Sequence, residues 1–238
     1  MDLLAVIRTA SGRLAGAAAS RPGASVPRYP GWTLLDLLIH TGSAHRRATK
    51  VVATTAQEKV EREFPPDEVP EVVLPWFTEG VASMVEALER ADPISEVWGF
   101  GPRPTVASWI LRMALETEVH RWDAECAMGS SSPIPAWLAA AGIEELLALW
   151  GGVMPLEQAP SLELVLTDLG ESWTLSAGEV GARLAPGSPS EPGDAVEGDA
   201  SEIYLWLMGR RDLAGLVCHG SGAVVWDAAF RALPDARR

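Results

Sequence analysis

A carboxylate and an imidazole lie one helical turn apart in the segment from about residue 105 to 128. Glu116 and His120 are four residues apart, a spacing that places both side chains on one face of a helix, where they can reach the same ion. Apolar residues precede them on that face, and Asp123 follows one turn later. The apolar half predicts that the face points into the core, where an ionised group needs hydrogen bonds, water or a metal.

A second histidine lies on an apolar face of an earlier helical segment. His40 shares its face with Leu37, Val51 and two alanines, which leave room beside the imidazole. If the two helices pack together, His40 joins Glu116 and His120. Two imidazoles and one carboxylate leave a coordination position open on a divalent ion, which is typical of a catalytic site. The sequence thus predicts a metal site for zinc, with nickel, iron or manganese as alternatives that accept the same donors.

Simpler interpretations of these residues stay open. A Glu and a His four residues apart often form a surface hydrogen-bonded pair, and a histidine on an apolar face is often a core residue whose ring is satisfied. Asp123 has two interpretations. It either orients His120 or handles a proton at the site, or it forms a plain salt bridge with an arginine such as Arg46 or Arg47.

Other polar and aromatic residues lie near the predicted ligands in the sequence. His45 is about 140° round the helix from His40, so we leave it out of the site. Trp98 and Phe100 precede the segment that carries Glu116. They either line the entrance to the site or, as exposed aromatic residues in loops more often do, simply cap the helices.

Hydrophobic periodicity predicts four long helices before residue 130. Thr33 can cap the second, with Asp36 at the capping-box position, and Gly129 is a good stop after the fourth. Four helices of this length predict a bundle. The expected ranges are 2–19, 33–57, 76–90 and 105–128, and a fifth helix at 136–150 leads to the rest of the chain.

The residue pattern of the sequence changes from helical to strand-rich after about residue 155. Short β-rich stretches separated by glycine turns alternate with two helical stretches, which predicts a small α+β domain. The strand candidates are SLELVLTD, ESWTLSAG, EVGARLAPG and LAGLVCHG, the helix candidates are ASEIYLWLMGRRD and AVVWDAAFRAL, and GSPSEPGD is a predicted loop. We therefore expect an α+β protein with two domains, residues 1–152 and residues 156–238.

Composition excludes several classes of function. A formal net charge of -13 disfavours a nucleic-acid partner, because phosphate binding needs clustered Lys and Arg. Apolar runs are broken before the roughly 18 residues that a membrane span needs. Asp2, Arg8 and Arg13 do not fit a signal peptide, so a cytoplasmic location is expected. The expected assembly is a monomer or a small homo-oligomer.

Three segments resemble the mycothiol-dependent maleylpyruvate isomerase family, and the resemblance covers nearly the whole chain. They are WTLLDLLIHTG, VWGFGPRPTVASWILRMALETEVHRWDAECAMG and IYLWLMGRRDL. The resemblance implies a DinB-like four-helix bundle followed by a small C-terminal domain. In that family a histidine of a D-L-x-x-H segment and the Glu and His of an E-x-x-x-H segment bind the metal. The corresponding residues are His40, Glu116 and His120.

The resemblance also implies mycothiol as a cofactor and an arginine near the substrate. The family's W-G-R segment supplies that arginine, and LMGRRDL places Arg210 there, with Met208 in place of the usual tryptophan. An arginine that faces solvent at the end of a helix is the alternative interpretation. Near the C-terminus the family tends to carry a Gly-Asp pair where this chain has HGSG, so the resemblance does not fix the substrate.

The implied chemistry is metal-activated addition of a thiolate to a small electrophile. Coordination deprotonates a thiol that is mostly neutral at pH 7. Addition to a conjugated cis double bond, rotation and elimination give a trans isomer, whereas a transferase stops at the thiol conjugate. The expected partners are a small-molecule thiol and a small electrophilic substrate. A metal-dependent hydrolase that uses bound water, and a metal-binding protein without turnover, are the alternatives.

Overall fold

The chain folds into two compact units, Met1–Ser132 and Pro133–Arg238. A computed structural model describes residues 2–101, 103–153, 159–178, 181–189 and 193–232. The first unit is helical and the second combines helices with a sheet, so the predicted α+β fold class is confirmed. No helix in these described ranges is long and apolar enough to cross a membrane.

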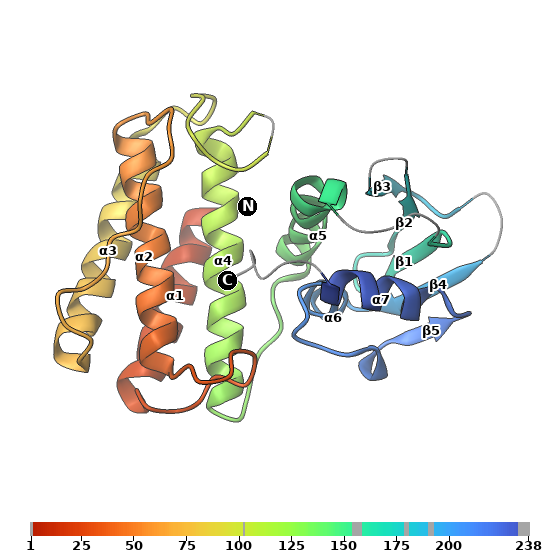
Figure 1. Ribbon diagram of the computed structural model, residues 1–238, viewed down its shortest axis with the longest axis horizontal. Helices are drawn as coiled ribbons and strands as arrows, with labels where there is room; N and C mark the ends of the chain where they lie inside the picture. Colours follow the sequence, from red (N-terminus) through yellow and green to blue (C-terminus); the bar gives the residue numbers. More distant parts are fainter. Residues whose placement is uncertain (1, 102, 154–158, 179–180, 190–192, 233–238) are drawn as a thin grey trace. The chain divides into compact units, whose positions relative to one another are not determined.

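Four long helices make up the first unit. They are α1 (Leu3–Ser20), α2 (Leu34–Ala53), α3 (Pro70–Arg90) and α4 (Val106–Ala127). Figure 1 shows the four side by side, and all of them contribute to one buried apolar cluster. Leu37 of α2 and Phe77 of α3 are almost fully inaccessible to solvent, and burying a side chain of this size contributes about 2 kcal/mol.

Polar caps fix where the two ligand-bearing helices begin. Thr33 and Asp36 form the predicted capping box at α2, in which the Thr33 amide donates to the Asp36 carboxylate at 2.8 Å. Thr105 and Ser108 form an equivalent box at α4. Gly129 follows the end of α4 with a φ of 89°, a left-handed conformation that glycine adopts without strain.

Helix α3 begins earlier than its sequence pattern predicts. The expected start was residue 76, because prolines 65, 66, 70 and 75 favour a loop, but the helix begins at Pro70 and contains Pro75. Proline fits the first position of a helix, where the missing N–H has no intrahelical acceptor. Gly42 of α2 then allows close packing, since a Cβ there would lie 2.4 Å from the Trp76 ring.

The second unit is a mixed sheet with helices. Its strand order is β3-β2-β1-β4-β5, with β1 and β4 parallel and the other neighbouring pairs antiparallel. The strands are β1 (Leu162–Leu166), β2 (Glu171–Ala177), β3 (Ala182–Pro186), β4 (Asp194–Gly198) and β5 (Val217–His219). The helices are α5 (Ala136–Trp150), α6 (Ala200–Leu207) and α7 (Gly222–Ala232), with short 3₁₀ turns at Gly151–Val153 and Leu213–Gly215.

Two features of this unit differ from the sequence expectations. Strand β4 was not predicted, because Asp, Gly and Glu have low strand propensity, yet it pairs with β1 on one side and β5 on the other. Helix α5, expected to lead from the bundle to the rest of the chain, groups with the second compact unit and packs with α6. Independent folding of residues 1–152 and 156–238 stays a prediction.

Candidate metal centre

Helices α2 and α4 bring the three predicted ligands together. His40 comes from α2, Glu116 and His120 come from α4, and one candidate ligand atom of each lies within 4.8 Å of the others. Both histidines are buried, with 8% of His40 and 1% of His120 exposed. The two imidazole rings meet edge to face, with centroids 5.1 Å apart. The cluster therefore joins residues 76 positions apart in the chain.

Glu116 contacts both histidines of the cluster. Its Oε1 lies 3.3 Å from Nε2 of His40 and 3.2 Å from Nε2 of His120. Its other oxygen, Oε2, accepts a hydrogen bond from Arg112 at 2.9 Å. Burial raises the pKa of Glu116, but hydrogen bonds from both histidines and the charge of Arg112 outweigh burial and bring this pKa well below its usual value. The carboxylate is thus ionised, as a metal ligand must be.

Asp123 supports His120 from the side away from Glu116. Its Oδ2 lies 3.1 Å from Nδ1 of His120, and the carboxylate is almost fully buried. Burial lowers the pKa of His120, but the hydrogen bonds to Asp123 and Glu116 outweigh burial, so the net shift is upward. Arg46, one of the alternative partners considered for Asp123, donates instead to the Trp76 carbonyl at 2.7 Å. Asp123 is thus in a position to orient His120, and its role at the site stays a prediction.

The donor set fits a divalent metal ion. Two imidazole nitrogens and one carboxylate oxygen converge from neighbouring helices, and such ligands suit zinc as well as nickel, iron and manganese. Burial lowers the pKa of His40, which leaves that imidazole neutral near pH 7 and able to donate a lone pair. Asp123 accepts a hydrogen bond from Nδ1 of His120. The ring proton is thereby held on Nδ1, and the lone pair of Nε2 is left for a metal.

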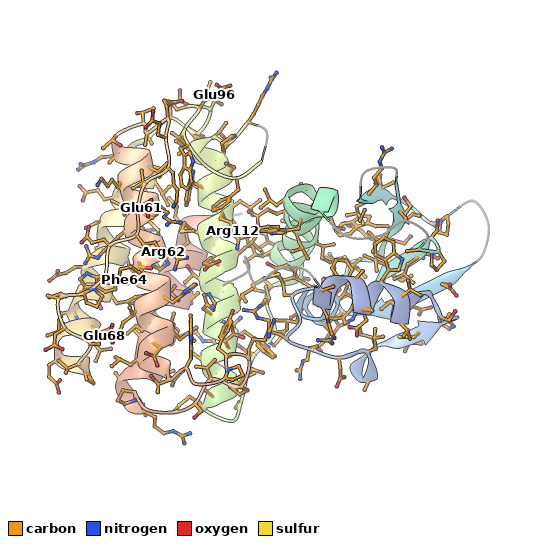
Figure 2. The ribbon with its side chains drawn as sticks, viewed as in Figure 1. Glu61, Arg62, Phe64, Glu68, Glu96 and Arg112 are labelled. Carbon is orange, nitrogen blue, oxygen red and sulfur yellow. The ribbon has the colours of Figure 1, made fainter. Side chains whose placement is uncertain are left out.

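The sequence patterns did not identify several residues that lie beside the cluster. Arg112 lies one turn before Glu116, so helical spacing could have revealed it. Arg62 could not be found in that way, because it belongs to the segment between α2 and α3 that has no helix or strand. Its Nη1 lies 3.2 Å from Nδ1 of His40. Trp32, in the loop before α2, places its ring centroid 5.2 Å from that of His40. Figure 2 labels Arg62, in the segment between α2 and α3, and Arg112, on α4.

His45 lies outside the candidate metal cluster, as its position round the helix predicts. The residue is fully buried, and its Nε2 lies 2.9 Å from the Thr117 hydroxyl. Burial lowers its pKa to about 3, so the ring stays neutral. Phe77 lies beside it, with ring centroids 5.5 Å apart. His45 is therefore a core residue of the first unit.

The remaining candidates lie on other elements. Trp98 and Phe100 lie near the start of α4, with ring centroids 6.1 and 5.9 Å from that of Trp109 and the ring planes tilted. A role of these rings at an entrance to the site stays a prediction. Arg210 follows α6 in the second unit, is partly buried, and donates from Nη1 to the Met208 carbonyl at 3.0 Å.

The first unit is helical and holds a buried cluster of two histidines and one carboxylate, and the second is a small α+β unit. These features define the chain as a protein with a candidate metal centre. The family described as the mycothiol maleylpyruvate isomerase N-terminal domain matches residues 3–125, more than half of the chain. The chain belongs to this family, and the resemblance noted in its sequence is confirmed.

Two solved structures share the fold. A crystal structure of the mycothiol-dependent maleylpyruvate isomerase matches with a TM-score of 0.65 and 16% identity, over 93% of this chain and 94% of that chain. A crystal structure of a histidine-to-alanine mutant of that isomerase matches over the same shares, with a TM-score of 0.64 and 15% identity. No curated protein matches the chain. Identities this low establish a common fold and nothing finer.

Proposed function

We propose that this protein is a metal-dependent and mycothiol-dependent enzyme that isomerises a small acidic electrophile or transfers a thiol to it. The observation that carries the proposal is the convergence of His40, Glu116 and His120 in a chain of this family. Three protein ligands leave a coordination position open for a reactant, unlike the closed shell of a structural site. The names of the similar structures supply the thiol, mycothiol, and the isomerase reaction.

Each polar residue of the centre has a distinct role in this proposal. His40, Glu116 and His120 hold the ion, for which zinc is our choice. A bound divalent ion supplies positive charge that lowers the pKa of a thiol. Asp123 holds the proton on Nδ1 of His120 and so keeps Nε2 available. Arg112 keeps Glu116 ionised and fixes its orientation through Oε2.

The decisive experiment adds mycothiol to protein in which cobalt replaces the native metal. We expect a sulfur-to-metal charge-transfer band in the near ultraviolet and the release of close to one proton near neutral pH, because a coordinated thiol binds as thiolate. Absorbance titration and calorimetry in two buffers of different ionisation enthalpy measure the two effects. N-acetylcysteine serves as the thiol control, and it should bind more weakly.

The alternatives give different results in that titration. A hydrolase that activates water at the same three ligands needs no thiol, so mycothiol would change neither the spectrum nor the melting temperature. A metal carrier or sensor without turnover would behave in the same way and would also lack hydrolytic activity. The cytoplasm, where thiols stay reduced, remains the expected location, and a monomer or small homo-oligomer the expected assembly.

The second prediction concerns Arg210. We propose that this arginine binds a carboxylate of the substrate, since a guanidinium can hold a carboxylate through two hydrogen bonds and an ammonium group cannot. Arg210→Lys should therefore lower kcat/KM by about tenfold to a thousandfold, which corresponds to roughly 1.4 to 4 kcal/mol of lost transition-state binding. Metal content and melting temperature should stay unchanged. Arg90→Lys, at an exposed position of α3, is the control, and equal turnover of both variants would contradict the role.

A further inference from the structure

A second polar contact joins the two helices that carry the candidate ligands. Nε2 of His45, on α2, lies 2.9 Å from Oγ1 of Thr117, on α4, and both residues are fully buried. Thr117 follows Glu116 directly in the chain, and His45 comes five residues after His40. Figure 1 shows the two helices side by side, and they pack against each other. The contact therefore lies beside the candidate metal centre without including any of its ligands.

The direction of this hydrogen bond follows from its partners. The Thr117 hydroxyl donates its single proton to the Met113 carbonyl, with 2.6 Å between the two oxygen atoms. Its oxygen can therefore only accept from His45. Burial lowers the pKa of His45 to about 3, so the neutral ring carries one proton, which lies on Nε2. Since Nδ1 has no hydrogen-bond partner in the described ranges, the ring has one hydrogen-bonded orientation there.

A third helix holds the other side of the imidazole. Phe77 of α3 contacts His45, with ring centroids 5.5 Å apart. The close approach of α3 depends on Gly42 of α2, because a Cβ at that position would lie 3.1 Å from Cδ2 of Phe77. The imidazole is thus confined by packing as well as by its hydrogen bond.

Stability of the fold does not by itself explain a polar pair at this position. Replacing both partners of a buried hydrogen bond by apolar groups of the same shape is nearly neutral for stability. Apolar packing is non-directional, whereas a hydrogen bond has a preferred length and angle. Sliding one helix along another by one residue displaces its side chains by about 1.5 Å, and ligand distances in a metal site tolerate about 0.2 Å. A directional contact therefore suits a centre whose ligands are divided between two helices.

We propose that His45 is a positioning residue of the metal centre, which sets the position of α2 along α4 through its hydrogen bond to Thr117. His40 is thereby held at the distance from Glu116 and His120 at which all three side chains reach one ion. The proposal rests on the proposed function, because it assumes that these three residues bind the metal. It adds a residue that acts on the ligands through the helices rather than by contact with the ion.

The decisive variant replaces both partners, as His45→Phe with Thr117→Val. Phenylalanine and valine are close in shape to the side chains they replace, so the metal-free double variant should unfold at close to the wild-type urea concentration. Its affinity for zinc, from competition with a chromophoric chelator, should nevertheless fall by about tenfold to a hundredfold, the range typical of residues that orient metal ligands. The visible absorption bands of the cobalt form should shift as well, because they report the coordination geometry.

Single variants separate positioning from burial. Thr41→Val is the matched control, because Thr41 is buried on α2 and its hydroxyl donates within its own helix, to the Leu37 carbonyl at 2.9 Å. This variant should bind zinc as the wild type does. His45→Gln offers an amide N–H to Thr117 and should stay within about threefold of the wild-type zinc affinity. If the double variant does not fold, Thr117→Val alone provides the comparison with Thr41→Val.

The outcomes separate this inference from the proposed function. Wild-type zinc affinity in the double variant overturns the role of His45 even if mycothiol binds. An equal loss of zinc affinity in Thr41→Val, or a loss of tenfold or more in His45→Gln, overturns it too. Loss of zinc affinity in the double variant, without any response of the wild type to mycothiol, supports the inference and removes the thiol chemistry. A wild-type protein that binds no zinc removes both.

Discussion

His120→Ala is expected to lower the affinity for zinc by about a thousandfold, or roughly 4 kcal/mol, and to abolish turnover. The imidazole is one of three protein ligands, and its Nε2 lies 3.2 Å from the Glu116 carboxylate that would share the ion. Two remaining ligands cannot hold an ion against competing water as three do. Metal content after dialysis, measured by mass spectrometry, and chelator competition give the affinity.

The effect should be specific to the three ligand positions. His40→Ala and Glu116→Gln should lose zinc to a similar degree, whereas His219→Ala should keep it, because His219 is exposed on β5. Circular dichroism of the metal-free forms separates loss of metal from loss of fold, and His120→Gln provides a variant with less change in volume. Full zinc occupancy in folded His120→Ala would show that the metal lies elsewhere.

The second large effect concerns stability and the end of α4. Arg121 is 1% exposed and pairs with the carboxylates of Glu118 and Glu125, and it also donates to the Ser132 carbonyl at 2.6 Å. Arg121→Met would remove this cation from the buried Glu118 carboxylate, whereas Glu125 would keep its ion pair with Arg13. Breaking a buried ion pair in this way costs about 3–5 kcal/mol. The free energy of unfolding from urea titration measures the loss.

A surface ion pair provides the matched control for Arg121. Arg90 and Glu86 pair on the exposed side of α3, so Arg90→Met should cost less than about 1 kcal/mol. Adding Glu118→Gln to Arg121→Met should recover part of the lost stability, because one unpaired charge is removed. If Arg121→Met unfolds at the same urea concentration as Arg90→Met, the buried network contributes no more to stability than the exposed pair.

Helical geometry is what the sequence determined most firmly. A four-residue separation places Glu116 and His120 on one face whatever surrounds them, and the apolar residues before them indicated that this face is buried. The capping box at Thr33 and the glycine after α4 are equally local signals, and the structure has both. Such features were predictable because neighbours in the chain alone decide them.

Tertiary packing decided the rest of the candidate centre. His40 meets Glu116 only because α2 packs against α4, and Arg62 reaches His40 from a segment with no periodic pattern. Strand β4 forms because two strands hydrogen-bond to it, although its own residues disfavour a strand. Helix α5 was predicted with the correct bounds, whereas its packing with α6 is a tertiary contact that the apolar pattern does not specify. Contacts between residues far apart in the chain carry no local sequence signal, so only the folded structure reveals them.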